Sequence, residues 1–118
     1  MKVSPFAVVL AKLLAIPSLA LTDNPQSCID PATIDDDTDL FPVKTNIKYS
    51  KKWSISYHKT YKILTDTDTG ESYLLYQCGT TPPEDEVDKH SQIFSIPLDS
   101  IVPSSTQEIS YLEQLGKR

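Results

Sequence analysis

The clearest pattern in the chain is an alternation of apolar and polar residues that begins at Trp53. Trp53, Ile55 and Tyr57 are separated by serines, and the alternation continues through Tyr61 and Ile63. Alternation with a period of two is typical of a strand that buries one face and exposes the other. This stretch is therefore predicted to be a half-buried strand.

A second β-prone run, residues 72–78, follows a break at residues 65–70 that is rich in turn-forming residues. Gly70 can adopt a positive φ at no steric cost, which suits a tight turn between two strands. The two runs are therefore predicted to pair as an antiparallel hairpin about residues 68–70.

The hydrophobic pattern becomes weaker after the hairpin. Residues 79–90 contain two adjacent prolines and a charged run, so they are predicted to be a loop. Residues 92–96 and 99–102 are short apolar runs on either side of Pro97. We expect them to form two short strands, or one strand that bends at the proline.

One helix is predicted near the C-terminus. Ser105 and Glu108 have the spacing of a capping box, in which each side chain accepts a hydrogen bond from the backbone amide of the other. Apolar residues then recur at helical spacing, namely Ile109, Leu112 and Leu115. Gly116 follows where a helix stop is expected. The predicted fold class is α+β or an incomplete α/β fold, rich in β-strand, with this helix at its end.

Residues 1–20 are predicted to be a secretory signal peptide. A basic start precedes an apolar stretch, a helix breaker at Pro17 and small residues at positions 18 and 20, which are the features of a cut after Ala20. No membrane span is expected, because a span needs about 18 uninterrupted apolar residues and Lys12 interrupts this stretch. The protein is therefore expected to be secreted or periplasmic.

Length and charge exclude several classes of protein. A chain of 118 residues has room for one small domain, which excludes a complete two-lobed receptor, a Rossmann dehydrogenase or a TIM barrel. The 11 basic and 16 acidic residues give a net charge of −5. Nucleic acid is therefore excluded as a partner, because an acidic chain has little attraction for a phosphate backbone.

The two cysteines, Cys28 and Cys78, both lie after the predicted signal peptide. In an oxidising compartment, two cysteines without a competitor most simply form one disulfide. A free Cys78 acting as a nucleophile is disfavoured there, and no histidine is near it in sequence. The disulfide would tether the N-terminal arm, residues 21–45, which is acidic and predicted to be solvated, to a β-rich part over residues 46–118.

Neither a metal nor a cofactor is expected. The aspartates of residues 35–39 lack the glycine turn that would make their oxygens converge on calcium, and Gly70 stands where an EF-hand needs a ligand. His58 is expected on the polar face of its strand, and the neighbouring tyrosines are expected to be packing residues.

The sequence does not predict an enzyme. It contains no nucleophile elbow, zinc-protease motif or phosphate-binding loop, and His58 and His90 lie in none of these motifs. Catalysis by a pair of carboxylates stays open, because folding alone can bring two acids together.

The strand-like Ile101 and Val102 lead through a Ser/Thr turn into the sequence LEQLG at residues 112–116. This resembles the opening strand and first helix of the periplasmic solute-binding proteins of the cobalamin, iron-siderophore and metal ABC uptake systems. Four upstream blocks resemble the amino-terminal extension of one branch of that family: FPVK at 41–44, YSK at 49–51, SYHKTYK at 56–62 and QCGT at 77–80. Pro103 departs from the more usual serine.

The resemblance implies a partial first lobe of a clamshell receptor, as a fragment or truncated form. It implies an iron chelate or similar small solute as the ligand, and an ABC permease as the partner of the full-length receptor. The family's cleft position falls on Ser104, Ser105 and Thr106, where a helix N-terminus offers unpaired amides to anionic groups. The alternative at this turn is that Ser105 is only a cap and the other amides are hydrated.

A different class of function competes with the receptor interpretation. The chain can also be a free-standing, secreted, β-rich interaction protein that is stapled by Cys28 and Cys78 and works through surface contacts.

Overall fold

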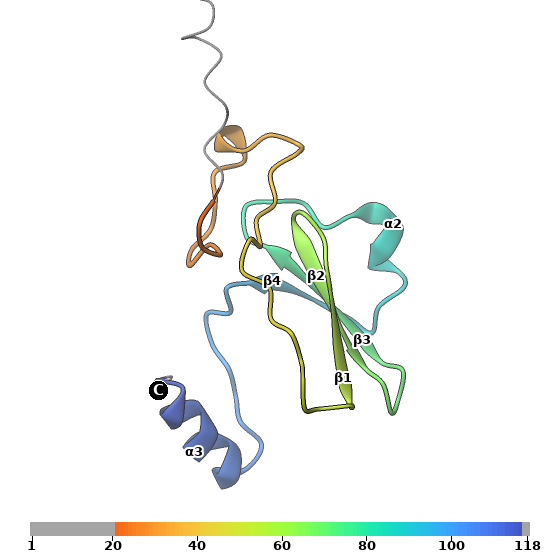
Figure 1. Cartoon of the computed structure of the whole chain (residues 1–118), viewed down its shortest axis with the longest axis vertical. Coiled ribbons are helices and arrows are strands. Elements are labelled where there is room, and N and C mark those ends of the chain that lie inside the picture. The colour runs from red at the N-terminus through yellow and green to blue at the C-terminus, as the bar shows by residue number, and fades with distance from the viewer. Residues whose placement is uncertain (1–20, 117–118) are drawn as a thin grey trace, which may run out of the picture.

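The computed structural model describes residues 21–116, and the predicted signal peptide lies outside them (Figure 1). Within this range the elements are η1 (Pro31–Thr33, a 3-10 helix), β1 (Trp53–Tyr57), β2 (Tyr61–Asp66), β3 (Ser72–Gln77), α2 (Glu84–Val87), β4 (Gln92–Ile96) and α3 (Thr106–Gln114). The strands form one sheet in the order β1-β2-β3-β4, with β4 parallel to β3 and the other pairs antiparallel. A mixed α+β fold is thus confirmed.

The prediction of a continuous strand from Trp53 to Ile63 is wrong. The chain folds back after Tyr57, and the His58 amide donates to the carbonyl of Tyr61 at 2.9 Å to close the turn. Because β2 runs antiparallel to β1, Ile63 lies on the opposite face of the sheet from Trp53. Alternation with a period of two does not show where the chain reverses direction. The turn at residues 58–60 also contains no glycine or proline that would have indicated it.

The hairpin of β2 and β3 is confirmed. The Asp66 amide donates to the carbonyl of Glu71 at 2.8 Å, and Gly70 adopts a φ of 77°. The Asp66 carboxylate accepts from the amides of Asp68 and Thr69, at 2.8 and 3.3 Å. These bonds hold the pKa of Asp66 below its usual range, so this carboxylate serves the turn.

The connection from β3 to β4 was predicted to be a plain loop. This prediction is wrong in part, because the connection contains the four-residue helix α2. Pro83 stands at its N-cap, and the three acidic residues that follow are favourable at the positive end of a helix. Parallel neighbours need a crossover of about a dozen residues, and residues 78–91 supply it.

The second short strand predicted over residues 99–102 is absent from the described residues. β4 ends at Ile96, because Pro97 has no amide hydrogen with which to continue the ladder. Val102 is 92% exposed and pairs with no neighbour. An apolar run forms a strand only where another strand is available to pair with it.

The core is small and takes two of its side chains from the N-terminal arm. Leu40, Phe41 and Leu74 are buried among the hydrophobic residues described, so the prediction of a solvated arm is wrong at its end. The Leu40 amide donates to the carbonyl of Lys59 at 2.8 Å, and the Phe41 ring lies 6.1 Å from that of Tyr57. The arm therefore covers part of the sheet.

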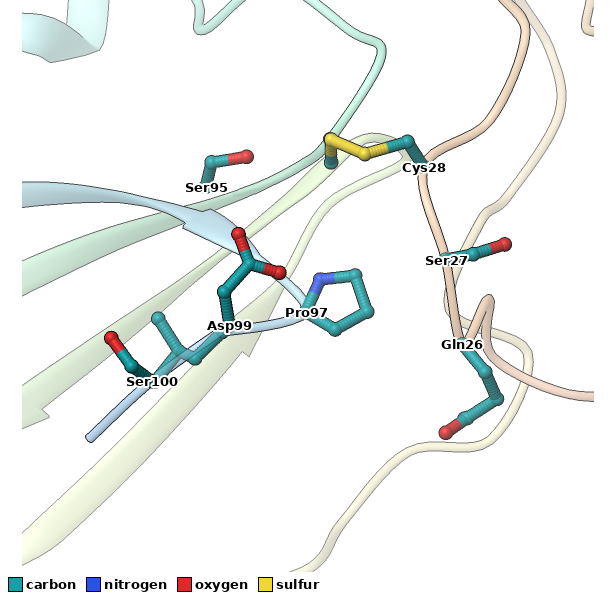
Figure 2. Close-up of a pocket in the computed structure, with 9 residues that line it drawn as sticks. Gln26, Ser27, Cys28, Ser95, Pro97, Asp99 and Ser100 are labelled. Carbon is teal, nitrogen blue, oxygen red and sulfur yellow. A yellow bond between two sulfur atoms is a disulfide. The ribbon is translucent and has the colours of Figure 1, made fainter.

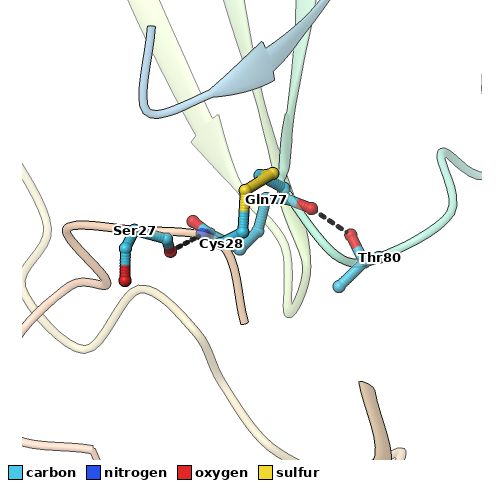
Figure 3. Close-up of a disulfide and its surroundings, with 5 residues drawn as sticks. Ser27, Cys28, Gln77 and Thr80 are labelled. Carbon is cyan, nitrogen blue, oxygen red and sulfur yellow. Dashed lines mark hydrogen bonds between the residues drawn. A yellow bond between two sulfur atoms is a disulfide. The ribbon is translucent and has the colours of Figure 1, made fainter. Parts of the chain in front are cut away.

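The disulfide between Cys28 and Cys78 is confirmed (Figure 3). Beside it, the Ile29 amide donates to the carbonyl of Cys78 at 3.0 Å, and the side-chain amide of the buried Gln77 donates to the carbonyl of Ser27 at 2.9 Å. These bonds fasten the arm to the end of β3. A disulfide of this kind fits a secreted or extracellular protein.

Replacing both cysteines by serine should destabilise the protein by roughly 4 kcal/mol, because the bond closes a loop across a sequence separation of 50 residues. The free energy of unfolding, measured in urea, tests this value. The same loss should follow reduction of the wild-type protein. An unchanged unfolding midpoint after reduction would show that the arm is held without the bond.

The substitution Gly79→Ala should destabilise the protein more than Gly70→Ala. Both glycines have positive φ, 97° and 77°, so each alanine carries a similar backbone penalty of about 1 kcal/mol. A Cβ at position 79 would also overlap the carbonyl of Ile29, whereas position 70 is open. The extra cost should be about 1–3 kcal/mol, measured as the difference between the two unfolding free energies. Equal costs would mean that the arm is not packed against Gly79.

Candidate functional site

The turn predicted to bind ligand stands at the start of α3 and forms a complete capping box. The Ser105 hydroxyl accepts from the Glu108 amide at 3.4 Å, and the Glu108 carboxylate accepts from the Ser105 amide at 3.2 Å. The same carboxylate accepts from the amide of Ser104 at 2.6 Å. The predicted cap is therefore confirmed, and the bond from the Ser104 amide is an addition that the sequence pattern does not predict.

Glu108 already occupies part of the anion-binding position at this helix end. Its hydrogen bonds, first from the Ser104 amide, hold the pKa of the Glu108 carboxyl below its usual range. Helical residues in the first turn have no intrahelical acceptor for their amides, so the amide of Thr106 remains available. An external anion would therefore meet a preformed site in which a carboxylate of the chain itself is the competitor.

The residues around this turn expose most of their apolar side chains. We call residues 98–116 the C-terminal segment, and Figure 1 shows its helix α3 separated from the sheet. Val102 is 92% exposed, and Leu115 is 75% exposed. Leu98, Ile101, Ile109 and Tyr111 are also exposed. The predicted binding turn thus lies in a segment whose apolar side chains remain largely in contact with solvent.

A groove of about 520 Å³ lies where the arm meets β4 (Figure 2). Its walls are Gln26, Ser27, Cys28, Cys78, Ser95, Pro97, Leu98, Asp99 and Ser100. The lining offers hydroxyl groups and one carboxylate, from Asp99, but no cationic side chain. It is therefore poorly suited to an anionic chelate. No sequence pattern predicts this groove, because it depends on the disulfide that joins segments far apart in the chain.

Residues considered for metal binding are used in other contacts. The His58 ring stacks on that of Tyr61 at 4.3 Å between centroids, and its Nε2 lies 3.2 Å from the hydroxyl of Ser56. Asp68, in the turn near Gly70, pairs with Lys52 at 3.2 Å. Over residues 21–116, no cluster of three or more His, Cys, Asp or Glu side chains could hold a metal ion.

The substitution Ser105→Ala should unfold α3 selectively. Loss of the cap costs a helix about 1 kcal/mol, and this short helix lies apart from the sheet. We expect the Cα chemical shifts of residues 106–114 to move toward coil values while the unfolding midpoint of the sheet stays unchanged. Ser110→Ala is the matched control, because alanine in mid-helix should preserve or increase helix content. A lower midpoint for the sheet would contradict this independence.

Acidification should weaken the same helix. The pKa of Glu108 is lowered in the folded protein, so its stabilisation is complete above the usual carboxyl range and is lost as pH falls through the lowered pKa. Chemical shifts of α3 followed from neutral to acidic pH should therefore show unfolding that Glu108→Gln largely removes. If Glu108→Gln and wild-type protein titrate alike, the capping carboxylate is not the cause.

Among the described residues, none of the helices is long and apolar enough to cross a membrane. No protein-family model matches the chain, and searches of curated proteins and of solved structures gave no significant match.

Proposed function

We propose that the chain is the N-terminal part of an exported solute-binding receptor for ABC-type uptake, with an iron chelate or similar anionic solute as its ligand. The observation that carries this proposal is the uncovered apolar side of the C-terminal segment. In an α/β lobe, an opening strand and its following helix are covered by neighbouring strands and helices. Without those neighbours the apolar run before the helix has no strand to pair with and the helix stays uncovered, which agrees with the exposure of Val102 and Leu115 at 92% and 75%.

In this proposal the sheet and the arm are not part of the ligand-binding lobe. Their core is held by the disulfide and by residues of the arm, and it does not use α3. In this proposal they form an N-terminal extension that is held by its own contacts, while the C-terminal segment begins the ligand-binding lobe.

The turn at Ser104, Ser105 and Thr106 is the proposed contact with the solute. The helix end carries positive partial charge, which favours the anionic groups of a chelate. Because Glu108 accepts from the amides of Ser104 and Ser105, a ligand must either displace that carboxylate or bind at the next amide. The capped turn therefore binds weakly until the ligand makes further contacts with the rest of the receptor.

An interaction protein is the second candidate, and the same exposed apolar side chains favour it. In that case the C-terminal segment would contact a protein partner instead of the remainder of a lobe. The two candidates agree on the fold of the sheet, and they differ in what binds at residues 104–106.

Paramagnetic relaxation in ¹⁵N-labelled protein distinguishes the two. Ferric citrate should broaden the amides of residues 104–107 more than those of the hairpin turn at residues 65–70, and gallium citrate is the diamagnetic control. Glu108→Gln should tighten binding by roughly two- to fivefold under conditions where the Cα chemical shifts show α3 still formed, because glutamine can keep the capping-box acceptor while it removes a negative charge from the helix end.

Glu113→Gln is the matched control, because it removes the same charge from the other end of α3. Equal effects of the two variants would indicate general electrostatics only. Broadening that is no greater at residues 104–107 than at the hairpin turn would contradict solute binding there and favour the interaction protein.

A further inference from the structure

Three polar side chains, from β3, from α2 and from the loop before β4, are connected by hydrogen bonds beside β3. The hydroxyl of Ser72, the first residue of β3, lies 2.7 Å from Nδ1 of His90. Nε2 of the same ring lies 3.0 Å from a carboxylate oxygen of Glu86, in α2. The His90 side chain is 8% exposed and that of Glu86 is 20% exposed, so the hydrogen bond between these two side chains is largely shielded from water.

The backbone fixes this arrangement independently of the side chains. The Ser91 amide donates to the carbonyl of Ser72 at 2.8 Å, and Tyr73 pairs with Gln92 in the parallel ladder. His90 is therefore held next to Ser72 by the start of the β3–β4 pairing.

The charge on Glu86 determines which atoms carry the protons. Hydrogen bonds from His90 and then Lys89 hold the pKa of Glu86 below its usual range, so its carboxylate is ionised and can only accept. Nε2 of His90 must therefore donate to Glu86. In the neutral ring, Nδ1 is then the acceptor, and the Ser72 hydroxyl donates to it. A serine is thus hydrogen-bonded to a base that is oriented by a carboxylate.

A second hydroxyl stands beside Ser72 on the same face of the sheet. Thr65 lies directly opposite Ser72 in the β2–β3 pair, and Ser54 lies opposite Thr65 in the β1–β2 pair. Residues opposite each other in antiparallel strands share a face, with Cβ atoms about 4.5–5.5 Å apart. Among residues 21–116 the Thr65 hydroxyl makes no hydrogen bond, so it is free to donate to an oxygen held near Ser72.

We propose that Ser72 is a nucleophile with His90 as its base, and that this site accepts the acyl group of small esters. Thr65 would donate to the carbonyl oxygen as negative charge develops there. The row of hydroxyls ends at the exposed Ser54, so an ester can approach Ser72 from that side of the sheet. The roles of the two imidazole nitrogens are exchanged relative to the usual serine triad, but either nitrogen can take up a proton.

The reaction proceeds by ordinary acyl transfer. Oγ of Ser72 bonds to the ester carbonyl carbon while its proton passes to Nδ1 of His90, and the carbonyl electron pair moves onto oxygen. When the carbonyl re-forms, the alkoxide leaves with the proton from Nδ1, giving an acyl-serine and a free alcohol. Water then attacks the acyl-serine by the same route, giving the acid and free Ser72.

Labelling with diisopropyl fluorophosphate tests this proposal on the purified protein with its disulfide intact. The Oγ–P bond forms, the P–F bond breaks, and fluoride and the hydroxyl proton leave. Peptide mapping of wild-type protein at limiting reagent should place the label on Ser72. The substitution Ser72→Ala should remove it, and His90→Asn should slow labelling by about 100-fold or more, which is the usual contribution of a general base.

The chain supplies a matched control in the pair of Ser56 and His58. Their polar atoms lie 3.2 Å apart, and no carboxylate in the described range accepts from His58. Ser56→Ala and His58→Asn should therefore leave the labelling rate unchanged. Label spread equally over exposed serines, or His90→Asn protein labelled at the wild-type rate, would overturn the proposal. The wild-type map decides alone if the His90 variant fails to fold.

Glu86 is a positioning residue, and its role has a separate readout. Glu86→Gln should slow labelling, and the ¹⁵N shifts of the His90 ring should show loss of the tautomer that carries the proton on Nε2. Slower labelling with an unchanged tautomer would mean that Glu86 acts only through the fold of α2, and would contradict its positioning role.

Discussion

The N-terminal arm is fastened to the end of β3 by the Cys28–Cys78 disulfide and by two hydrogen bonds, one on each side of it. This attachment brings Leu40 and Phe41 within reach of the sheet, where they form most of the buried apolar core of the described residues. A four-stranded sheet with so few buried side chains has little stability to spare. The cross-link offsets this by limiting the freedom of the unfolded chain.

The two parts of the described chain consequently differ in what holds them together. Residues 21–96 are organised by long-range bonds, which include the strand pairs of the sheet and the attachment of the arm at the end of β3. The C-terminal segment is organised only by its own local bonds, with the capping box as the strongest of them. A nine-residue helix is marginal in water without tertiary packing, so its cap and a covering partner both matter. This contrast supports the receptor proposal, because a lobe would supply the missing cover.

Features set by neighbouring residues could be predicted from the sequence, and features set by distant contacts could not. The Ser105–Glu108 cap and the Gly70 hairpin turn need only residues within a few positions of each other, and both were predicted. The disulfide was predictable as well, because a chain with two cysteines, Cys28 and Cys78, allows only one intramolecular pairing. The burial of Leu40 and Phe41 left no periodic signal, because an irregular segment can pack without repeating its side-chain pattern.

The same distinction explains why the two candidate sites differ in how they could be found. Ser104, Ser105 and Thr106 are adjacent, and the resemblance to solute-binding proteins singled out their turn because it precedes a predicted helix. Ser72 and His90 are separated by 18 residues and meet only because β4 runs parallel to β3. A parallel neighbour requires a crossover, and α2 within that crossover is what carries the carboxylate to the other side of the imidazole ring. The parallel β3–β4 pair and its crossover, which the sequence did not predict, are therefore also what brings together Ser72, His90 and Glu86 of the proposed site.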